Sequence, residues 1–461
     1  MKILLVSTNR ERSPYPVAPL GAMTAAAAAR RAGHQVDLLD LMFSRSFKRK
    51  LKTSLQSRDY QLVAFSIRNL DNCLYCCPKT YTEPVRQMSR VVRSVTDVPL
   101  VVGGSGFSLA PNRWLQFLDA SFGIVGEAET SFPALLERIS AGRSVQDIPG
   151  VICRAETGDP PRSAQVNELL CPAHDLCNYT PYISSGGYVS VQTKRGCPYN
   201  CTYCTYPKLE GAQYRLRDPA SVVDELQSVS RSGKSCPVYF ADSVFNTPRE
   251  HALAICRLMT CRNLKIPWLT YCNPLQFDLD LAGAMVEAGC VGVEFGIDTA
   301  CEKMLSALRK PFGLSDIRNA LLAAAKANLP FAVHLLFGGP GETPSDVIET
   351  QKFLDSCSKP NAVFATLGIR IYTGTVIEQI ARRDGLLSSD GDLFEPVYYL
   401  SPAFSNNPAK MLDGIARMRA EWSTPTDWNS LKMRILQKIM NLSGVRPQWL
   451  NAANYGKYIR R

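Results

Sequence analysis

The feature that most constrains the fold is an alternation of short apolar runs with longer helical patterns, which occurs in two series along the chain. The first series lies within residues 1–140 and the second within 188–402, and a connector containing Pro and Gly joins them at 141–187. Strands that alternate with helices form parallel sheets that carry helices on their faces. The sequence therefore predicts an α/β protein with two such domains and a mainly helical C-terminal tail at 403–461.

The first series predicts a doubly wound, Rossmann-like sheet. Its Ala-rich segment Leu20–Ala32 is a strong helix former that ends before Gly33. Ligands of such sheets bind beyond the carboxyl ends of the strands. No Gly-x-Gly-x-x-Gly fingerprint opens the first helix, which disfavours a plain dinucleotide site. The strands are expected at Ile3–Ser7, Val36–Leu39, Leu62–Ser66, Leu100–Val102 and Phe122–Val125.

The second series holds six β/α units, which predicts a parallel sheet curled into a partial (β/α)6 barrel. In such barrels the chemistry lies at the carboxyl ends of the strands. Helical patterns such as Ser221–Ser230 and Leu279–Ala288 fill the gaps between strands. The strands are expected at Val189–Thr193, Pro237–Phe240, Trp268–Tyr271, Val291–Gly296, Phe331–Phe337 and Val363–Gly368.

A cysteine motif, KRGCPYNCTYC, directly follows the first strand of this second series. Cys197, Cys201 and Cys204 lie close enough together on one loop to hold three corners of an iron–sulfur cubane, because thiolates are soft ligands for iron. The lack of a fourth nearby cysteine leaves one iron open, as a catalytic metal site requires. Structural zinc would need four ligands, and buried structural cysteines rarely gather in a loop with Gly and Pro. The motif therefore favours a [4Fe–4S] cluster.

This spacing, with the aromatic Tyr203 before the third cysteine, resembles the radical SAM superfamily over roughly Gly187–Pro402. The resemblance implies that the open iron chelates the amino and carboxylate groups of S-adenosylmethionine (SAM). Electron transfer from the cluster would then give methionine and a 5′-deoxyadenosyl radical. Tyr203 would pack beside the cofactor.

Further residues at the predicted strand ends match places where that family contacts SAM. Asp242 at such an end can accept hydrogen bonds from the methionine ammonium, although a role at a helix N-cap is an equal alternative. Glu294 is a charged residue within an apolar strand and therefore needs a partner, which favours a ligand role for it. The glycines let backbone approach a ligand, and a plain strand-to-helix turn is the competing interpretation. These residues are Asp242, Ser243, Glu294, Gly339, Pro340 and Gly341.

The first domain, with GGSGFSLAP and IVGEAE at successive strand ends, resembles the cobalamin (B12)-binding subgroup of these enzymes. The resemblance implies that Gly103, Gly104 and Ser105 border the nucleotide tail of cobalamin, with Ser66 and Gly126 at neighbouring strand ends. The Asp-x-His-x-x-Gly motif is missing, which leaves the lower ligand of cobalt unassigned. The alternative is a degenerate domain that binds nothing.

A second group of cysteines, Cys73, Cys76 and Cys77 in NCLYCC, could suggest another metal site. Adjacent cysteines strain tetrahedral coordination, and no fourth ligand is evident, so an incidental cluster is the favoured interpretation.

The net charge of +11 is concentrated in the tail, where ten basic and three acidic residues from Ser401 onward supply +7. This local charge does not indicate a nucleic-acid footprint. The tail, with Trp422, Trp428 and Trp449, is expected to cap the barrel, and contact with an anionic substrate, partner or membrane surface is the alternative. No apolar run is long enough for a membrane span, and the apolar start is too short for a signal peptide, so a cytoplasmic protein is expected.

The subgroup resemblance implies C-methylation of an unactivated carbon, in which one SAM methylates cobalamin and another supplies the radical. The substrate would be a small molecule or a peptide, and a flavodoxin or ferredoxin would donate electrons. Radical cyclisation or rearrangement is one alternative, and a non-catalytic cobalamin carrier or sensor is another. A carrier would not need the three-cysteine loop.

Overall fold

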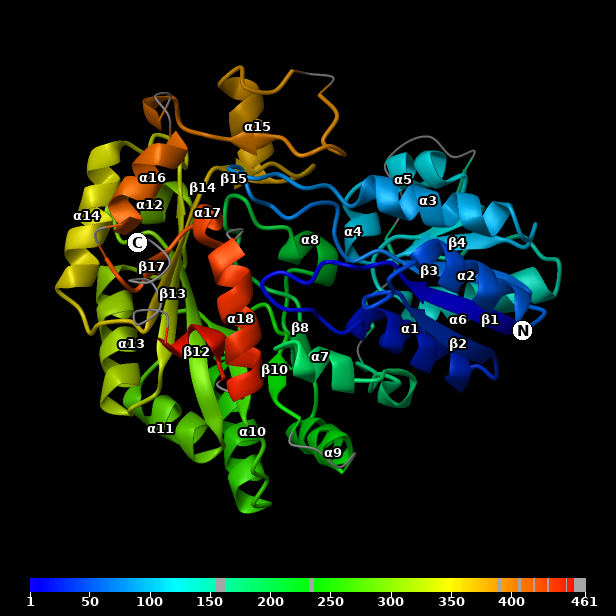
Figure 1. Cartoon of the computed structure of the whole chain (residues 1–461), viewed down its shortest axis with the longest axis horizontal. Coiled ribbons are helices and arrows are strands. Elements are labelled where there is room, and N and C mark those ends of the chain that lie inside the picture. The colour runs from blue at the N-terminus through cyan, green and yellow to red at the C-terminus, as the bar shows by residue number, and fades with distance from the viewer. Residues whose placement is uncertain are drawn as a thin grey trace.

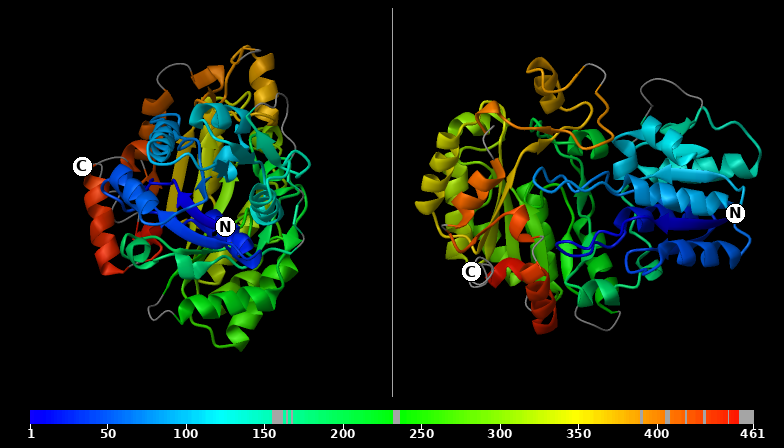
Figure 2. Two further views of the ribbon diagram at one scale, coloured as in Figure 1. Left: turned by 90° about the vertical axis from the view of Figure 1, so that its right-hand side faces the viewer. Right: turned by 45° about the horizontal axis from the view of Figure 1, so that its top comes forward.

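The computed structural model describes residues 1–154, 162–163, 165–166, 168–231, 236–388, 391–404, 408–417, 419–428, 431–444 and 446–451. Two large sheets, one mainly and one wholly parallel, lie beside each other rather than stacked, and each has its own helices (Figures 1 and 2). The predicted α/β architecture, with a doubly wound first domain and a second domain of the barrel type, is confirmed.

The first sheet has six strands in the order β2-β1-β3-β4-β5-β6. All neighbouring pairs are parallel except β5 and β6, which are antiparallel. Each strand that was predicted forms, to within two residues at either end. The bounds are β1 (Lys2–Ser7), β2 (Gln35–Asp40), β3 (Leu62–Ser66), β4 (Leu100–Gly103), β5 (Phe122–Ile124) and β6 (Val151–Cys153).

Helices cover both faces of the first sheet, because its buried strands are apolar on both sides. On one face, α1 and α6 pack against residues such as Ile3 and Leu5. On the other face, α2, α3 and α5 pack against residues such as Phe65 and Val102. The helices are α1 (Leu20–Arg31), α2 (Phe47–Gln56), α3 (Thr82–Arg93), α4 (Ser105–Ser108), α5 (Pro111–Leu118) and α6 (Ala128–Ser140).

The second sheet has seven strands in the order β17-β14-β13-β12-β11-β10-β7, and all neighbouring pairs are parallel. Six of them are the predicted strands of the barrel, and the seventh, β17, comes from the C-terminal tail. The bounds are β7 (Val189–Val191), β10 (Val238–Phe240), β11 (Trp268–Cys272), β12 (Cys290–Asp298), β13 (Phe331–Phe337), β14 (Ala362–Leu367) and β17 (Trp422–Ser423).

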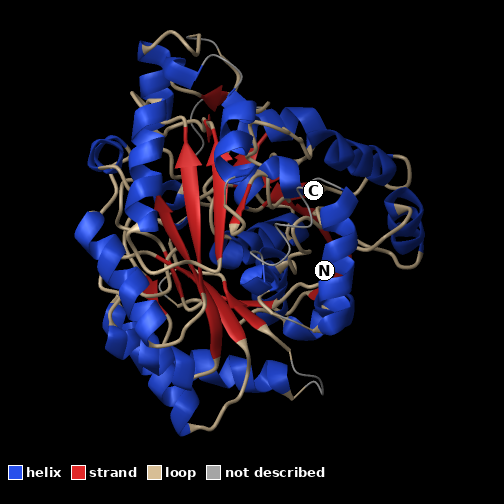
Figure 3. Cartoon of the chain, turned by 60° about the vertical axis from the view of Figure 1, so that its left-hand side comes forward, coloured by secondary structure: helices blue, strands red, loops and turns tan. Residues whose placement is uncertain are grey.

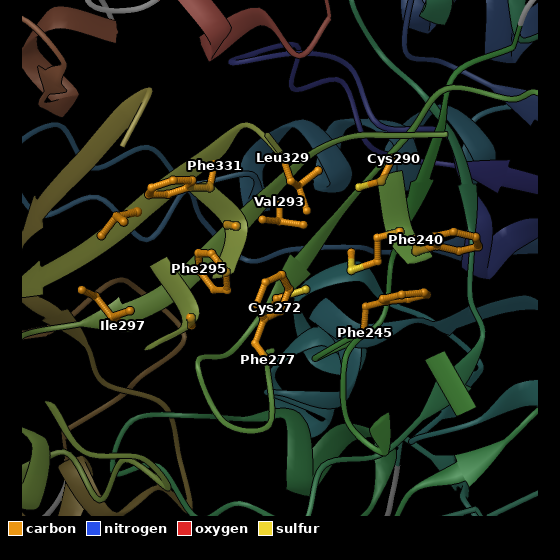
Figure 4. Close-up of a cluster of buried hydrophobic side chains, with 14 of the residues drawn as sticks. Phe240, Phe245, Cys272, Phe277, Cys290, Val293, Phe295, Ile297, Leu329 and Phe331 are labelled. Atoms are coloured by element: carbon orange, nitrogen blue, oxygen red, sulfur yellow. The ribbon is translucent and has the colours of Figure 1, made fainter. Parts of the chain in front are cut away.

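Helices cover the outer face of the second sheet (Figure 3). They are α9 (Pro219–Ser230), α10 (Arg249–Cys261), α11 (Leu279–Glu287), α12 (Glu302–Ala307), α13 (Leu314–Lys326) and α14 (Pro344–Asp355). The outward strand residues Phe240, Phe295 and Phe331 pack beneath these helices in one apolar core (Figure 4). Because side chains alternate along a strand, the residues between them face the concave side. The concave side therefore receives Tyr239, Glu294 and other polar residues.

Shorter elements connect the two sheets and surround the mouth of the second one. The predicted connector contains η1 (His174–Leu176) and α7 (Thr180–Ser184), and the cysteine loop is flanked by β8 (Lys194–Arg195), α8 (Tyr206–Glu210) and β9 (Arg215–Leu216). After β14 come β15 (Ile369–Arg370), α15 (Val376–Arg383), β16 (Tyr398–Tyr399) and η2 (Pro402–Phe404).

The described part of the tail packs on the second domain, as a cap would. It contains α16 (Pro408–Arg417), α17 (Pro425–Trp428), α18 (Leu431–Ser443) and η3 (Gln448–Asn451), and α18 crosses in front of the sheet (Figure 1). Arg446 donates hydrogen bonds to backbone oxygens of Gly187 and Ile183, and its guanidinium lies over Tyr188. This basic side chain therefore serves the packing of the tail. No helix among the described residues is long and apolar enough to cross a membrane.

Candidate active site

A cavity of about 460 Å³ lies where the two domains meet, at the carboxyl edges of both sheets. The first domain contributes Tyr15, Pro16, Val17 and Arg68 from the loops after β1 and β3. The second domain contributes all three cysteines of the motif and side chains that follow β10, β11 and β12. Both domains therefore contribute to the wall of this cavity.

The cysteine loop between β8 and α8 brings Cys197, Cys201 and Cys204 to one cavity. Gly196 allows its tight turn, since its φ is +88° and a Cβ there would lie 2.0 Å from the backbone oxygen of Gln213. Burial raises the pKa of all three thiols, to about 12 for Cys204. Without a metal these thiols stay protonated, so the thiolate form that binds iron needs the cluster to stabilise it.

A buried ion pair that the sequence analysis missed lies beside this loop. Lys310 Nζ is 2.8 Å from Asp298 Oδ2, and the two side chains are each 7% exposed. The Tyr203 hydroxyl donates a hydrogen bond to the same carboxylate. Burial opposes the charge on Lys310, but the Asp298 carboxylate outweighs it and raises the pKa of the lysine. A fixed positive charge therefore lines the cavity at the cluster position.

One sequence feature could have signalled Asp298, and the backbone of the structure marks the same residue. It ends GVEFGID, where a charge follows an apolar strand at the edge that carries the chemistry. In the structure Asp298 has a φ of +64°, which is unusual for a residue other than Gly, and the pairing of β12 with β13 shifts register there. The strained backbone turns its carboxylate towards the cysteine loop.

Asp242 and Ser243, predicted to meet the methionine end of SAM, both line the cavity. The carboxylate of Asp242 is already well bound, because Thr193 donates to both of its oxygens and Lys194 Nζ lies 3.4 Å away. The Ser243 hydroxyl donates to the backbone oxygen of Gly196 at 2.9 Å. Both residues therefore stabilise the cysteine loop, Asp242 through Thr193 before the loop and Ser243 through Gly196 within it.

Asn273 provides an unsatisfied polar group on the cavity wall. Among the described residues its side-chain oxygen and nitrogen are buried without a hydrogen-bond partner, while its backbone nitrogen donates to Asn246. Buried amides are nearly always hydrogen-bonded in folded proteins. The residues present therefore fit a polar ligand such as SAM beside the three cysteines.

Glu294 and the loop Gly339–Gly341 do not line this cavity among the residues that the structure describes. Glu294 is bound by other side chains on the concave face of the sheet. The backbone nitrogens of Gly338 and Gly339 donate to the Glu342 carboxylate, which closes the loop on itself. A contact between these residues and SAM remains a prediction from the family resemblance.

The predicted cobalamin-binding residues lie along the carboxyl edge of the first sheet. Gly104 has a φ of +103°, and a Cβ there would lie 2.5 Å from the backbone oxygen of Ile67. The Ser105 hydroxyl donates to the backbone oxygen of Arg68 at 2.7 Å, which fixes the loop that carries Arg68 into the cavity. Ser66, Gly103 and Gly126 lie at neighbouring strand ends. At this edge Gly104 lets backbone pack closely against backbone, and cobalamin contact with these residues stays a prediction.

Buried ion pairs hold the two domains together around the cavity. Glu127, which lies within IVGEAE just after β5, accepts hydrogen bonds from Arg215 of β9, and Glu129 Oε1 lies 2.5 Å from Arg195 Nη1 of β8 in an ion pair. Elsewhere, Asp71 of the first domain accepts a hydrogen bond from Arg370 of β15 at 2.8 Å. Glu127 therefore joins the domains, a role that the sequence pattern of a strand end could not reveal.

None of the four histidines lines the cavity. His174 could join Cys171 and Glu225 in a metal-binding group, but its two nitrogens already bond to Tyr179 and Glu225. Cys73, Cys76 and Cys77 belong to the first domain, in the loop between β3 and α3. Cys73 instead lies 3.1 Å from the Tyr372 hydroxyl. The three-cysteine loop is thus the cysteine cluster that faces the cavity.

Comparisons with known proteins agree with this geometry. The radical SAM superfamily model matches residues 191–354, and the B12-binding domain model matches residues 7–136. Tryptophan 2-C-methyltransferase of Streptomyces laurentii is 24% identical, covering 84% of this chain and 76% of that protein. Hopanoid C-3 methylase of Methylococcus capsulatus is also 24% identical, covering 69% and 60%.

A solved structure shares the whole fold. The radical SAM methyltransferase TsrM of Kitasatospora setae, solved with cobalamin and a [4Fe–4S] cluster bound, superposes with a TM-score of 0.85. The two chains are 24% identical, and the match covers 100% of this chain and 99% of TsrM.

A parallel sheet whose first loop presents three cysteines to a shared cavity defines a radical SAM protein. The domain in front of it binds B12 in the proteins that its family model describes. The chain belongs to the radical SAM enzymes that carry a B12-binding domain. Its cofactors are a [4Fe–4S] cluster, S-adenosylmethionine and cobalamin.

Proposed function

We propose that the chain is a C-methyltransferase that acts on an unactivated carbon of a small molecule or a peptide. The observation that carries the proposal is the single cavity, in which the three-cysteine loop and the cobalamin-side residue Arg68 lie on facing domains. Methyl transfer needs both cofactors next to one substrate, and a cavity lined from both domains supports such an arrangement. The described relatives that are named methyltransferases or methylases support the same reaction class.

The bound cofactors supply a methyl group and a radical or an electron, which no side chain can provide. The protein's own residues hold the cofactors, orient them and shield the reacting groups from water. Cys197, Cys201 and Cys204 are the proposed ligands of the cluster, and Lys310 keeps a positive charge beside it. Asn273 offers an unpaired amide to SAM. Tyrosines of the cavity wall exclude water from the reacting groups.

The surroundings of the reaction follow from the same chemistry. An oxidised cluster needs an external electron, so we infer a flavodoxin or a ferredoxin as the donor. Sixteen cysteines, all without disulfides among the described residues, suit a reducing compartment, so we place the enzyme in the cytoplasm.

Anaerobic reconstitution with iron, sulfide and cobalamin tests the proposal. With a chemical reductant such as titanium(III) citrate in place of the electron donor, the holoenzyme is expected to show cluster absorption, to retain cobalamin, and to convert SAM into S-adenosylhomocysteine, the product of methyl transfer. Formation of 5′-deoxyadenosine alone, without S-adenosylhomocysteine, would instead indicate the cyclase or rearrangement alternative. A protein that binds cobalamin but never turns over SAM would be a carrier.

A further inference from the structure

The connector between the two domains takes part in a group of three metal-binding side chains, away from the cofactor cavity. Cys171 lies just before η1 of the connector, His174 is the first residue of η1, and Glu225 lies on α9 of the second domain. One ligand atom from each residue lies within 4.8 Å of those of the other two. None of the three lines the cavity that holds the three-cysteine loop. The group is therefore separate from the site described above.

The residue types and their spacing suit a zinc ion. Cys171 and His174 are three positions apart, a spacing at which neighbouring zinc ligands commonly occur. Zinc binds thiolate and imidazole well, and a carboxylate oxygen is its other common protein ligand. The Glu225 side chain is 1% exposed and the His174 side chain 15%, whereas Cys171 is an exposed residue. The group thus runs from a buried carboxylate to a thiol that an ion in solution can reach.

The hydrogen bonds around His174 leave one ring nitrogen that needs a cation. The Tyr179 hydroxyl donates its one proton to Met23 Sδ at 3.4 Å, so His174 Nδ1 donates to the Tyr179 oxygen at 2.6 Å. In the neutral ring Nε2 then carries a lone pair, and it lies 2.7 Å from Glu225 Oε1, which can only accept. Two acceptors at this distance need a second ring proton or a metal ion between them. The Cys171 thiol beside them gives a metal ion a third ligand.

The groups behind the three ligands are placed as they are in metal sites. A histidine that binds a metal usually donates its other ring N–H to a neighbour, and a carboxylate that binds a metal is itself bonded. Tyr179 receives the histidine N–H, and Arg217 Nη1 lies 2.5 Å from Glu225 Oε2. Arg217 holds the outer oxygen of the carboxylate, which leaves Oε1 for the ion. The thiolate and the carboxylate together balance the two charges of zinc.

We propose that Cys171, His174 and Glu225 bind one zinc ion, with water as the fourth ligand of a tetrahedral site. When the ion binds, the Cys171 thiol releases its proton to solvent, and the sulfur and His174 Nε2 each form a bond to zinc. The ion replaces the direct contact between His174 and Glu225. This inference goes beyond the proposed function and does not depend on it.

Such an ion would fasten the connector to both domains. The segment around His174 is held to α1 of the first domain, since Ala173 donates from its backbone nitrogen to the Met23 backbone oxygen at 3.1 Å. Asp175 also pairs with Arg30 of α1 at 2.7 Å. The ligand Glu225 comes from α9, whose neighbouring residues pack in the core of the second domain. Because an ion that binds the folded state stabilises it, zinc should raise the temperature at which the holoenzyme unfolds.

Zinc uptake by the reconstituted holoenzyme tests the proposal, because a filled cluster occupies the cysteines of the motif. The protein is dialysed anaerobically against zinc buffered by a chelator, and bound zinc is measured by mass spectrometry. We expect one equivalent of zinc with a Kd of about 1 µM or lower. Absence of binding at this affinity would overturn the proposal.

X-ray absorption at the zinc edge identifies the ligands of the bound ion, and iron does not interfere with it. The spectrum should show one sulfur at about 2.3 Å and nitrogen or oxygen ligands at about 2.0–2.2 Å. Three sulfur ligands would mean that zinc has replaced iron in the three-cysteine loop. That result, or a zinc ion without sulfur, would also overturn the proposal.

Two variants locate the ion. Cys171→Ser and His174→Gln each remove one ligand, and each should weaken zinc binding by about a hundredfold. The glutamine amide can still donate a hydrogen bond to Glu225, so this variant separates a metal ligand from a hydrogen-bond partner. Cys177→Ser, at another connector cysteine outside the group, is the matched control and should bind zinc as the parent does. Parent-like zinc binding by Cys171→Ser or His174→Gln would refute the role of that residue.

The same samples separate the zinc site from the cofactor chemistry. Iron content, cobalamin content and S-adenosylhomocysteine formation are recorded for each protein, and parent-like iron and cobalamin contents show that a variant has folded. Normal cofactor chemistry without zinc uptake would refute the zinc site alone. Zinc uptake without S-adenosylhomocysteine formation would refute the methyltransferase alone.

Discussion

The carboxyl edges of the two sheets face one cavity, but they present opposite kinds of surface. The edge of the first sheet presents backbone, because Gly104 and Gly106 press against the loop at Ile67 and Asn69. The edge of the second sheet presents thiols and buried charges. A bare backbone surface suits a cofactor that brings its own chemistry. Charged side chains are needed where the protein must hold and tune a reactive centre.

The difference appears again in how each edge tolerates change. At the first edge the close packing of backbone on backbone is the critical feature, so an added carbon does the damage. At the second edge the paired groups are the functional feature, so removal of one partner does the damage. The following changes test this contrast, beginning with the largest expected effect.

Cys201→Ala should abolish the cluster chemistry. Two cysteines cannot hold a cubane that already has one open iron, so 5′-deoxyadenosine and S-adenosylhomocysteine should both fall below detection. Iron and sulfide content and product formation are the measurements. Cys261→Ala, at an exposed cysteine of α10, is the control and should retain the cluster. A Cys201→Ala protein with full iron and normal turnover would remove the three-cysteine loop from the mechanism.

Lys310→Met should leave Asp298 as an uncompensated buried carboxylate. Removing one partner of a buried ion pair costs about 3–5 kcal/mol in the free energy of unfolding. The double variant Lys310→Met/Asp298→Asn removes both charges and should recover much of that loss. Chemical denaturation of the single and double variants measures the difference. If the single variant unfolds like the parent protein, the pair is not buried in solution as it is in the structure.

Gly104→Ala should damage the first edge alone. Its Cβ would lie 2.5 Å from the backbone oxygen of Ile67 at a φ of +103°, which costs about 2–3 kcal/mol and moves the loop before Arg68. Cobalamin content should fall several-fold while the iron content stays normal. Gly21→Ala, in α1 with open space around it, is the control and should unfold at the same or a higher temperature. Equal loss of iron and cobalamin would mean that the two edges are not independent.

The contrast also explains how far the sequence could predict this protein. The pattern of apolar residues and the turn residues predicted the strands of both sheets. A strand with one or both faces buried needs apolar residues at fixed local positions, so its pattern can be recognised in the sequence. The cysteine spacing predicted the loop because its three proposed ligands all lie within residues 197–204 of the chain. Lys310 lies 106 positions after Cys204 in the chain, and only the fold brings it near the cysteines. Trp449 and Glu294 meet in the same way, which no local pattern announces.

Two residues took on roles that the local pattern did not suggest. Glu127 follows a strand end, the position where a ligand contact is expected, yet it pairs with Arg215 across the domain interface. Asp242 follows another strand end, yet Thr193 and Lys194 already bind its carboxylate. A charged residue at the end of a strand marks the carboxyl edge of the sheet. Its partner is decided by packing between segments that are distant in the chain.

Glu342→Gln should give the smallest change, a flatter pH dependence of stability. Burial raises the pKa of Glu342 to about 7, although hydrogen bonds from the backbone nitrogens of Gly339 and Gly338 lower it. The folded protein thus keeps this proton to a higher pH than the unfolded chain, and unfolding releases it between about pH 4.5 and about pH 7. The free energy of unfolding should therefore fall by about 2 kcal/mol as the pH rises through that window.

The glutamine variant cannot release this proton, so most of that fall should disappear in denaturation curves measured across the same window. Glu349→Gln changes an exposed carboxyl of the neighbouring helix α14 and is the matched control, which should keep the parent's slope. If both variants keep the slope, Glu342 is ionised in the folded protein. The second edge would then hold one more buried charge, and its contrast with the glycine-lined first edge would be sharper than the hydrogen bonds of this loop suggest.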